Sequence, residues 1–179
     1  MTETMEYQVT EERGEVEIRH YPAVWVATVA GNDDGETFGV LFRYITGNNQ
    51  PGQKIPMTAP VITPVKIPMT SPVISDAGSM SFVMPKDIAG DALPDPTDPR
   101  VSLREIPARD LAVIRFKGRA GAADVADARA RLLSVLAGAG IATVGEPFLM
   151  RYNPPFTPGF LRRNEVAVEI RRTSSGRVP

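Results

Sequence analysis

The chain has 179 residues, of which 42% are hydrophobic and 23% are charged, and its formal net charge is −1. This composition is typical of a globular protein with a substantial core, and the near-neutral charge gives no electrostatic reason to expect a nucleic-acid or acidic-membrane partner. The absence of cysteine excludes disulfides, thiolate metal sites and cysteine nucleophiles. The single histidine, His20, excludes most histidine-built metal centres.

The start of the chain gives no sign of export or membrane insertion. Residues 1–21 lack a basic segment followed by an apolar one, and no stretch approaches the roughly 18 apolar residues of a membrane-spanning helix. We therefore expect a cytoplasmic protein without a membrane partner.

The first half of the chain predicts strands followed by a helix. Residues 24–30 form an apolar, β-prone run. A helix is predicted over roughly residues 35–46, where the apolar side chains recur at helical spacing on one face. These side chains are Phe38, Leu41, Phe42 and Ile45. Gly47, followed by two asparagines, ends the helix.

A short motif then occurs twice, at residues 54–62 and 66–74, with eight of its nine positions identical. In an extended chain, each copy places Ile, Met, a small residue and Val on one face. Two prolines in each copy remove two donors from a strand ladder, which excludes a fully paired central strand. The motif therefore predicts edge strands or strand-like walls of a ligand groove.

A larger repeat relates the two halves at an offset of 85 residues, because residues 16–23 align with residues 101–108. In the second half an apolar run at 111–116 precedes a predicted helix at 122–139. Further strands are predicted after both helices. They lie at residues 54–74 and 79–84 in the first half and at 147–152 and 165–171 in the second.

Each half thus reads as strand, strand, helix, strand, strand, which indicates an α+β fold with a mostly antiparallel sheet. With two helices as cover, a sheet of about eight strands is expected to curl toward a distorted barrel. We predict one domain over residues 1–172, with pseudo-repeat halves at about 7–85 and 100–172 and a proline-rich linker at 86–99. Residues 173–179 are expected to form a disordered tail.

His20 is the first candidate site residue. In a strand it shares a face with Val16 and Ile18, so we expect it to be partly buried or to line an apolar surface. One hypothesis is a neutral imidazole that binds iron in a macrocycle with its own four nitrogens. The alternative is a strand-end histidine hydrogen-bonded to a neighbouring carboxylate or carbonyl.

A second set of candidates is apolar, with basic residues near it. These side chains suit a pocket for a flat apolar ligand, but core packing explains the same side chains and is the commoner role of such stripes. They are Phe38, Leu41, Phe42, Met57 and Met69. Basic side chains that could meet carboxylate tails are Arg43, Lys54, Lys66, Arg162 and Arg163. We find no phosphate-binding loop, nucleophile elbow or acid/base pair, which favours a binding protein over an enzyme.

Several motifs in the same order as here resemble the SOUL/heme-binding protein family. They lie at residues 16–26 (VEIRHYPAVWV), 54–61 (KIPMTAPV), 80–85 (MSFVMP), 93–101 and 152–166, and the resemblance runs from about Tyr7 to Arg172. It implies a distorted antiparallel barrel of two pseudo-symmetric halves, each with one helix. Such a fold is similar to the effector-binding domains of multidrug-sensing regulators.

The resemblance also implies binding of heme or a related tetrapyrrole. One branch of the family carries a histidine in the context of His20, proposed as an axial ligand. Another branch holds the porphyrin in a shallow groove beside the first helix, where Arg43 corresponds to a basic residue of that groove. The other basic groove positions fall on Gly35 and near Thr157, neither of which is basic.

Three hypotheses follow for function. The first is a cytoplasmic heme carrier or buffer. The second is an enzyme that removes or inserts the metal of a porphyrin on the same scaffold. The third is a small-molecule sensor or interaction module, which would need a partner to reach DNA.

Overall fold

The computed structural model describes residues 3–31, 33–50, 52–64, 78–88, 90–153 and 156–171. Its helices are α1 (Asp34–Ile45) and α2 (Ala122–Ala139), with short 3-10 turns η1 (Gly90–Ala92) and η2 (Gly159–Leu161). The strands are β1 (Glu3–Thr4), β2 (Gln8–Arg13), β3 (Val16–Tyr21), β4 (Val24–Ala30), β5 (Asn49–Gln50), β6 (Thr58–Pro64), β7 (Ser79–Val83), β8 (Asp95–Pro96), β9 (Ser102–Ile106), β10 (Arg109–Lys117), β11 (Thr143–Arg151) and β12 (Arg163–Ile170).

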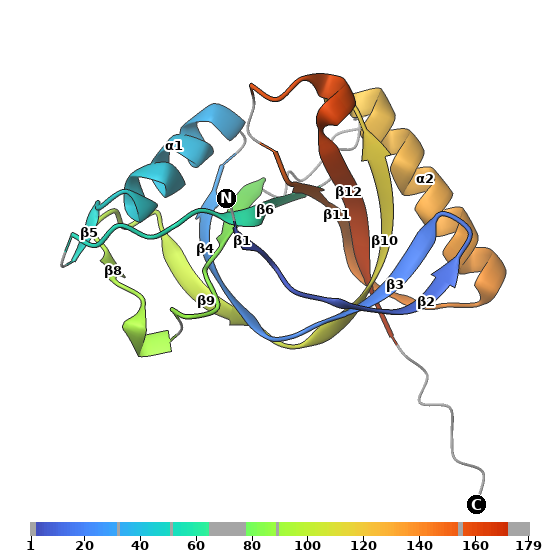
Figure 1. The fold of residues 1–179 in the computed structure, drawn as a ribbon, viewed down its shortest axis with the longest axis horizontal. Coiled ribbons are helices and arrows are strands. Elements are labelled where there is room, and N and C mark those ends of the chain that lie inside the picture. The colour runs from blue at the N-terminus through green and yellow to red at the C-terminus, as the bar shows by residue number, and fades with distance from the viewer. Residues whose placement is uncertain are drawn as a thin grey trace, which may run out of the picture.

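Ten strands form one bent sheet, with α1 outside it at the left and α2 outside it at the right of Figure 1. Helix α1 packs on β4 and β7, and α2 packs on β10, β11 and β12. The fold is therefore α+β with a large and mainly antiparallel sheet, as predicted. A parallel pair between β1 and β6 is the exception in this sheet.

The strand order shows how the two halves are related. It runs β2-β3-β10-β12-β11-β6-β7-β4-β9, with β1 beside β6. Exchanging β3 with β9, β4 with β10, β6 with β11 and β7 with β12 reverses this order, apart from the added β2. Each half thus places its first strand against the other half, since β3 pairs with β10 and β9 pairs with β4. The predicted repeat of strand, strand, helix, strand, strand is confirmed, and the first strand of each repeat pairs with the other half.

The predicted barrel is not confirmed, because the sheet is open. Its path ends at β2 on one side and at β9 on the other, and these two strands are not paired. All six residues of β2 are exposed. Both edge strands carry charged side chains, which disfavour further strand pairing. The described sheet has ten strands rather than about eight, because β1 and β2 precede the first strand of the repeat.

The first copy of the repeated motif contributes β6, whose place in the sheet differs from the prediction. It lies in the middle of the sheet, between β11 and β7, rather than at an edge. Its pairing with β7 is nevertheless interrupted between Thr58 and Val61, around Pro60. The prolines therefore prevent a fully paired strand, as expected, without moving it to an edge. The second copy lies within residues 65–77, outside the described residues.

The predicted linker contains packed structure. Leu93 is buried against the α1 core, and the hydroxyl of Tyr44 donates to the carbonyl of Pro94 at 2.7 Å. Strand β8 pairs with β5, just after α1. Residues 173–179, the predicted tail, lie outside the described residues.

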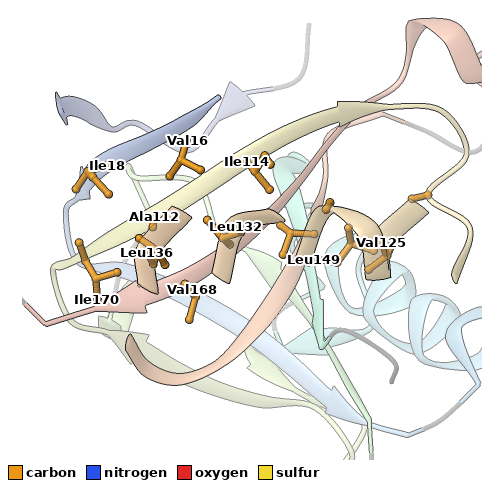
Figure 2. Packing of buried hydrophobic residues seen from close by; sticks show 13 residues of the cluster. Val16, Ile18, Ala112, Ile114, Val125, Leu132, Leu136, Leu149, Val168 and Ile170 are labelled. Carbon is orange, nitrogen blue, oxygen red and sulfur yellow. The ribbon is translucent and has the colours of Figure 1, made fainter. Parts of the chain in front are cut away.

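Three hydrophobic clusters make up the core. One lies under α1 and a second lies under α2. The third, which we call the inner cluster, joins the two halves and includes Tyr21, Val26, Leu111 and Met150. Figure 2 shows the α2 cluster, in which Leu132 and Leu136 face residues of β3, β10 and β12.

A buried ion pair crosses the inner face of the sheet. Arg19 on β3 donates two hydrogen bonds to Glu165 on β12, at 2.9 and 2.7 Å. The two side chains are 1% and 0% exposed. Arg19 also donates to Glu17 and to the hydroxyl of Tyr21. Its guanidinium lies 4.1 Å from the ring centroid of Tyr7.

The pKa of Glu165 follows from this pairing. Burial by itself raises the pKa of the carboxyl group, but hydrogen bonds and charge attraction from Arg19 outweigh it, with help from Arg163. The net result is a pKa below the ordinary value of 4.5. Glu165 is therefore ionised in the folded protein at neutral pH.

We expect Leu132→Ala to lower the free energy of unfolding by about 2–5 kcal/mol, because Leu132 is fully buried under α2 and its truncation leaves a cavity. Urea titration measures the change. Leu133→Ala, on the same helix at a partly exposed position, is the matched control and should have a clearly smaller effect. Equal losses would contradict the packing of α2 described above.

Arg19→Met should lower the free energy of unfolding by about 3–5 kcal/mol, because it leaves the Glu165 carboxylate buried without its main partner. The control is Arg13→Met, which removes an exposed pair with Glu11 and should change stability by less than about 1 kcal/mol. Chemical denaturation of both variants at neutral pH compares them. If Arg19→Met lowers the free energy of unfolding no more than the control does, the buried ion pair between Arg19 and Glu165 would be contradicted.

Glu165 should also contribute to acid unfolding. Its pKa is lower in the folded than in the unfolded chain, so its stabilising effect is present above the unfolded-state pKa and is lost as the pH falls through the folded-state pKa. Glu165→Gln should make the free energy of unfolding less dependent on pH in this acidic range. Urea titrations of wild type and variant over the same pH series give the two slopes, and identical slopes would exclude this contribution.

Candidate functional site

His20 lies at the end of β3, beyond the part of the strand that α2 covers. Val16 and Ile18, on the same face, are 0% and 2% exposed, whereas the His20 side chain is 47% exposed. The imidazole is therefore more accessible than the strand alternation predicted, because the covering helix does not extend over this last position.

The His20 ring is held by a neighbouring strand. His20 and Asp110 are cross-strand partners in β3 and β10, and His20 Nδ1 lies 2.8 Å from Asp110 Oδ1. A carboxylate only accepts hydrogen bonds, so Nδ1 carries the proton and, in the neutral ring, Nε2 keeps its lone pair. This is the carboxylate contact that was considered as an alternative to metal binding. It is also the arrangement that orients metal-binding histidines, so the two interpretations are compatible.

A surface depression adjoins His20. It has a volume of about 630 Å³, within the usual range for ligand pockets. Its lining comes from the N-terminal segment, His20 and the residue after β3; the lining residues are Thr4, Met5, Glu6, Tyr7, Gln8, His20 and Pro22. Among the described residues, no group of three or more His, Cys, Asp or Glu side chains is placed to hold a metal ion.

The buried network fixes one wall of this depression. Tyr7 receives a hydrogen bond from Arg163 at its hydroxyl, at 3.0 Å, and its ring lies under the guanidinium of Arg19. It also contacts the ring of Tyr21, with centroids 5.2 Å apart. Tyr7 is therefore held from both ends of its side chain, next to the accessible imidazole.

The predicted apolar candidates on α1 divide between core and surface. Leu41 is 0% exposed and packs in the α1 cluster, so the structure gives it a core role. Phe42 is 48% exposed, and its ring is stacked on Phe38 at 5.9 Å with an interplanar angle of 14°. Phe38 also contacts Phe82 edge-on in the core. Met57 is partly buried beside the same cluster.

The charges near this helix are largely matched. Arg43 is exposed. Hydrogen bonds from Arg100 lower the pKa of Asp98 to about 2, and Arg43 adds a smaller effect in the same direction. Arg100 also contacts Glu36 at 3.3 Å. Arg43 thus acts at longer range on a carboxylate that Arg100 already pairs.

Lys54 is exposed, whereas Lys66 and Met69 lie outside the described residues. Exposed apolar side chains at η2 were not predicted as candidates. Phe156, Phe160 and Leu161 are 86%, 73% and 60% exposed. A possible signal was their position in a proline-punctuated loop, where large apolar residues have no strand or helix face to pack against.

The candidate residues therefore occupy separate places. The depression at His20 has no lining residue from α1. In Figure 1, α1 lies at the upper left and β3 lies at the right. The structure does not bring the imidazole and the stacked aromatic pair together into one site.

Among the described residues, no helix has the length and apolar character needed to cross a membrane. A search of curated proteins finds no match. Solved structures show a similar fold at low sequence identity. The EcmrR C-terminal domain aligns at 12% identity with a TM-score of 0.63, covering 94% of this chain and 100% of that chain.

Two further comparisons agree on the fold. EcmrR in its DNA complex aligns at 13% identity with a TM-score of 0.64, covering 93% of this chain and 58% of that longer chain. A crystal structure described as a hydrolase from Listeria innocua aligns at 12% identity with a TM-score of 0.55, covering 90% of this chain and 94% of that chain. These comparisons establish the fold and support the predicted likeness to effector-binding domains.

Membership of a family rests on the sequence itself. The model of one family matches nearly the whole chain, from residue 2 to residue 169. The matched segment includes both helices, the exposed imidazole and all but the last of the paired strand residues. The chain therefore belongs to the SOUL heme-binding protein family.

Proposed function

We propose that this protein binds heme or a related tetrapyrrole and acts as a cytoplasmic carrier or buffer, with His20 as the iron ligand. The observation that carries the proposal is the 2.8 Å contact between His20 Nδ1 and Asp110 Oδ1 on an accessible imidazole. It orients the ring so that Nε2 is available to a metal. Membership of the SOUL heme-binding protein family supports the choice of ligand.

The residues around His20 fit such a group in three respects. A porphyrin supplies four nitrogens to its iron, so His20 would be able to hold the group without further protein ligands. The adjoining depression is about 630 Å³ in volume. Its lining residues include the apolar Met5 and Pro22 and the aromatic Tyr7, residue types that suit a flat apolar ligand.

Asp110 has a positioning role in this proposal. Its carboxylate accepts the Nδ1 proton, which fixes the tautomer and makes Nε2 a stronger electron donor. When bound, the heme iron would supply the redox and ligand-binding chemistry of the complex. The chain's own residues would hold the macrocycle through His20, and Asp110 would orient the imidazole.

The stacked pair on α1 is the alternative position for the same ligand. Phe42 and Phe38 present a flat apolar surface, and Arg43 is next to it in sequence. Met57 packs beside the same cluster. Binding there would use the aromatic rings and would leave the imidazole free. Substitutions at the two places distinguish these positions.

We expect His20→Ala to abolish the spectral signature of a histidine-ligated heme and to weaken binding in a Soret titration, because the variant loses the imidazole nitrogen that would bind the iron. Asp110→Asn should keep His20 as the iron ligand and should lower the affinity for heme about 10–100-fold, the usual effect of changing a partner of a metal-binding histidine. Phe42→Ala is the matched control at the alternative position and should leave the spectrum unchanged.

The opposite pattern, with loss of binding in Phe42→Ala and none in His20→Ala, would move the site to α1. A wild-type titration without a saturable Soret shift would reject heme binding altogether. Release of free-base porphyrin over many turnovers would favour the enzyme hypothesis, and strictly stoichiometric binding would favour a carrier. Co-purification of another apolar organic molecule would favour the sensor hypothesis.

A further inference from the structure

A second depression lies where strands of the two halves meet. It has a volume of about 300 Å³, and its walls come from β6, β7, β9, β10 and β11. Its apolar part belongs to the inner cluster and consists of Ile62, Ile106 and Phe148. None of its lining residues lines the depression at His20 or belongs to α1.

Two arginines give this depression its charge. Arg109 has a side chain that is 20% exposed, and its guanidinium lies 5.1 Å from the ring centroid of Phe148. Its ion pair with Glu169 is long, at 3.8 Å. Arg104 also lines the depression and, within the part of the chain that the structure describes, has no ion-pair partner.

The acidic side chains nearby compensate this charge only in part. Glu146 is the acidic residue among the lining residues, but its side chain is 82% exposed and lies 3.5 Å from Arg129. Burial lowers the pKa of Arg109, and the positive charge of Arg104 acts in the same direction against the attraction of Glu169. Arg109 is therefore a partly desolvated cation that an added negative charge would stabilise.

Residues with hydroxyl groups also line the depression. Thr63, Ser79 and Ser81 all line the depression, and Thr63 and Ser81 are each 5% exposed. A hydroxyl can donate a hydrogen bond to a carboxylate, and a guanidinium donates in a fork that matches both of its oxygens. The depression thus combines hydrogen-bond donors, positive charge and apolar side chains in its lining.

We propose that this depression binds a small organic anion, a carboxylate attached to an apolar ring. The carboxylate would pair with Arg109 and Arg104, and the ring would pack on Ile62, Ile106 and Phe148. The volume lies at the lower end of the range for ligand pockets, which favours a single-ring molecule over a macrocycle. This site is separate from the one proposed for heme, and each proposal can fail without the other.

The experiment is a titration of ¹⁵N-labelled protein with benzoate, followed by amide chemical shifts. Benzamidine, which has a similar shape and the opposite charge, and neutral benzamide are the matched control ligands. We expect saturable shifts centred on Ser81, Ile106 and Phe148 with benzoate, and much weaker binding of both controls. Equal binding of benzamidine, shifts centred elsewhere, or a response that stays linear over the whole range would overturn the proposal.

Variants test the assigned charges. Arg109→Gln should weaken benzoate binding about 10–100-fold, the usual effect of losing a charge-assisted hydrogen bond. Glu146→Gln removes the lining carboxylate and should tighten binding about 2–5-fold, as expected for a partly solvated charge. Arg13→Gln, at the exposed β2 edge, is the control and should have no effect.

Glu146 is highly exposed, so Glu146→Gln stays informative even if Arg109→Gln fails to fold. If Glu146→Gln binds benzoate more weakly than the wild type does, the proposed preference of the depression for a negative charge would be contradicted. A heme titration of the same samples distinguishes the two proposals, because loss of benzoate binding should leave the Soret response unchanged.

Discussion

The inner face of this protein depends on the ion pair between Arg19 and Glu165. The two residues lie on β3 and β12, which are separated by β10 in the sheet. A guanidinium and a carboxylate removed from water need each other's charge and hydrogen bonds, so this geometry tolerates little displacement. The pair therefore helps to fix β3 relative to the second half next to the candidate site residue His20.

The same constraint determines what surrounds it. Arg19 points inward, so the strand alternation turns His20 to the opposite face, where Asp110 meets it. Tyr7 packs on the Arg19 guanidinium and is hydrogen-bonded by Arg163. The buried ion pair thus packs against Tyr7, a residue that lines the same depression as His20. Inward and outward positions alternate along β3. The residue that forms the buried ion pair is therefore the direct neighbour of the residue in the candidate site.

The pseudo-symmetry of the sheet explains where the second depression forms. Each half gives its first strand to the other, so β9 belongs by sequence to the second half and pairs with β4 of the first. The sheet stays open, and side chains of both halves meet on the inner cluster. Arg104 and Arg109 come from consecutive strands on either side of a tight connection, which places two like charges close together. Such an arrangement is unfavourable by itself and becomes favourable when an anion lies between the charges.

Local features of the sequence determined the elements and their repetition. Helical spacing of Phe38, Leu41, Phe42 and Ile45 predicted α1 to within one residue at each end, and the predicted range of 122–139 for the second helix agrees with α2. These signals act over one or two turns of chain, so they can be read without tertiary structure. The offset of 85 residues likewise predicted two halves with the same element order. Composition and motifs indicated the family, but not the position of the ligand.

Tertiary structure alone decided how the elements combine. The exchange of first strands, the open sheet and the central position of β6 depend on pairing between distant segments, which no local pattern encodes. The partners of the key side chains are also remote. Asp110 is 90 residues from His20, and Glu165 is 146 residues from Arg19. The sequence therefore identified His20 as a candidate, whereas only the fold exposed its ring, supplied its carboxylate and placed Phe42 elsewhere, because burial and cross-strand contacts arise when the halves pack together.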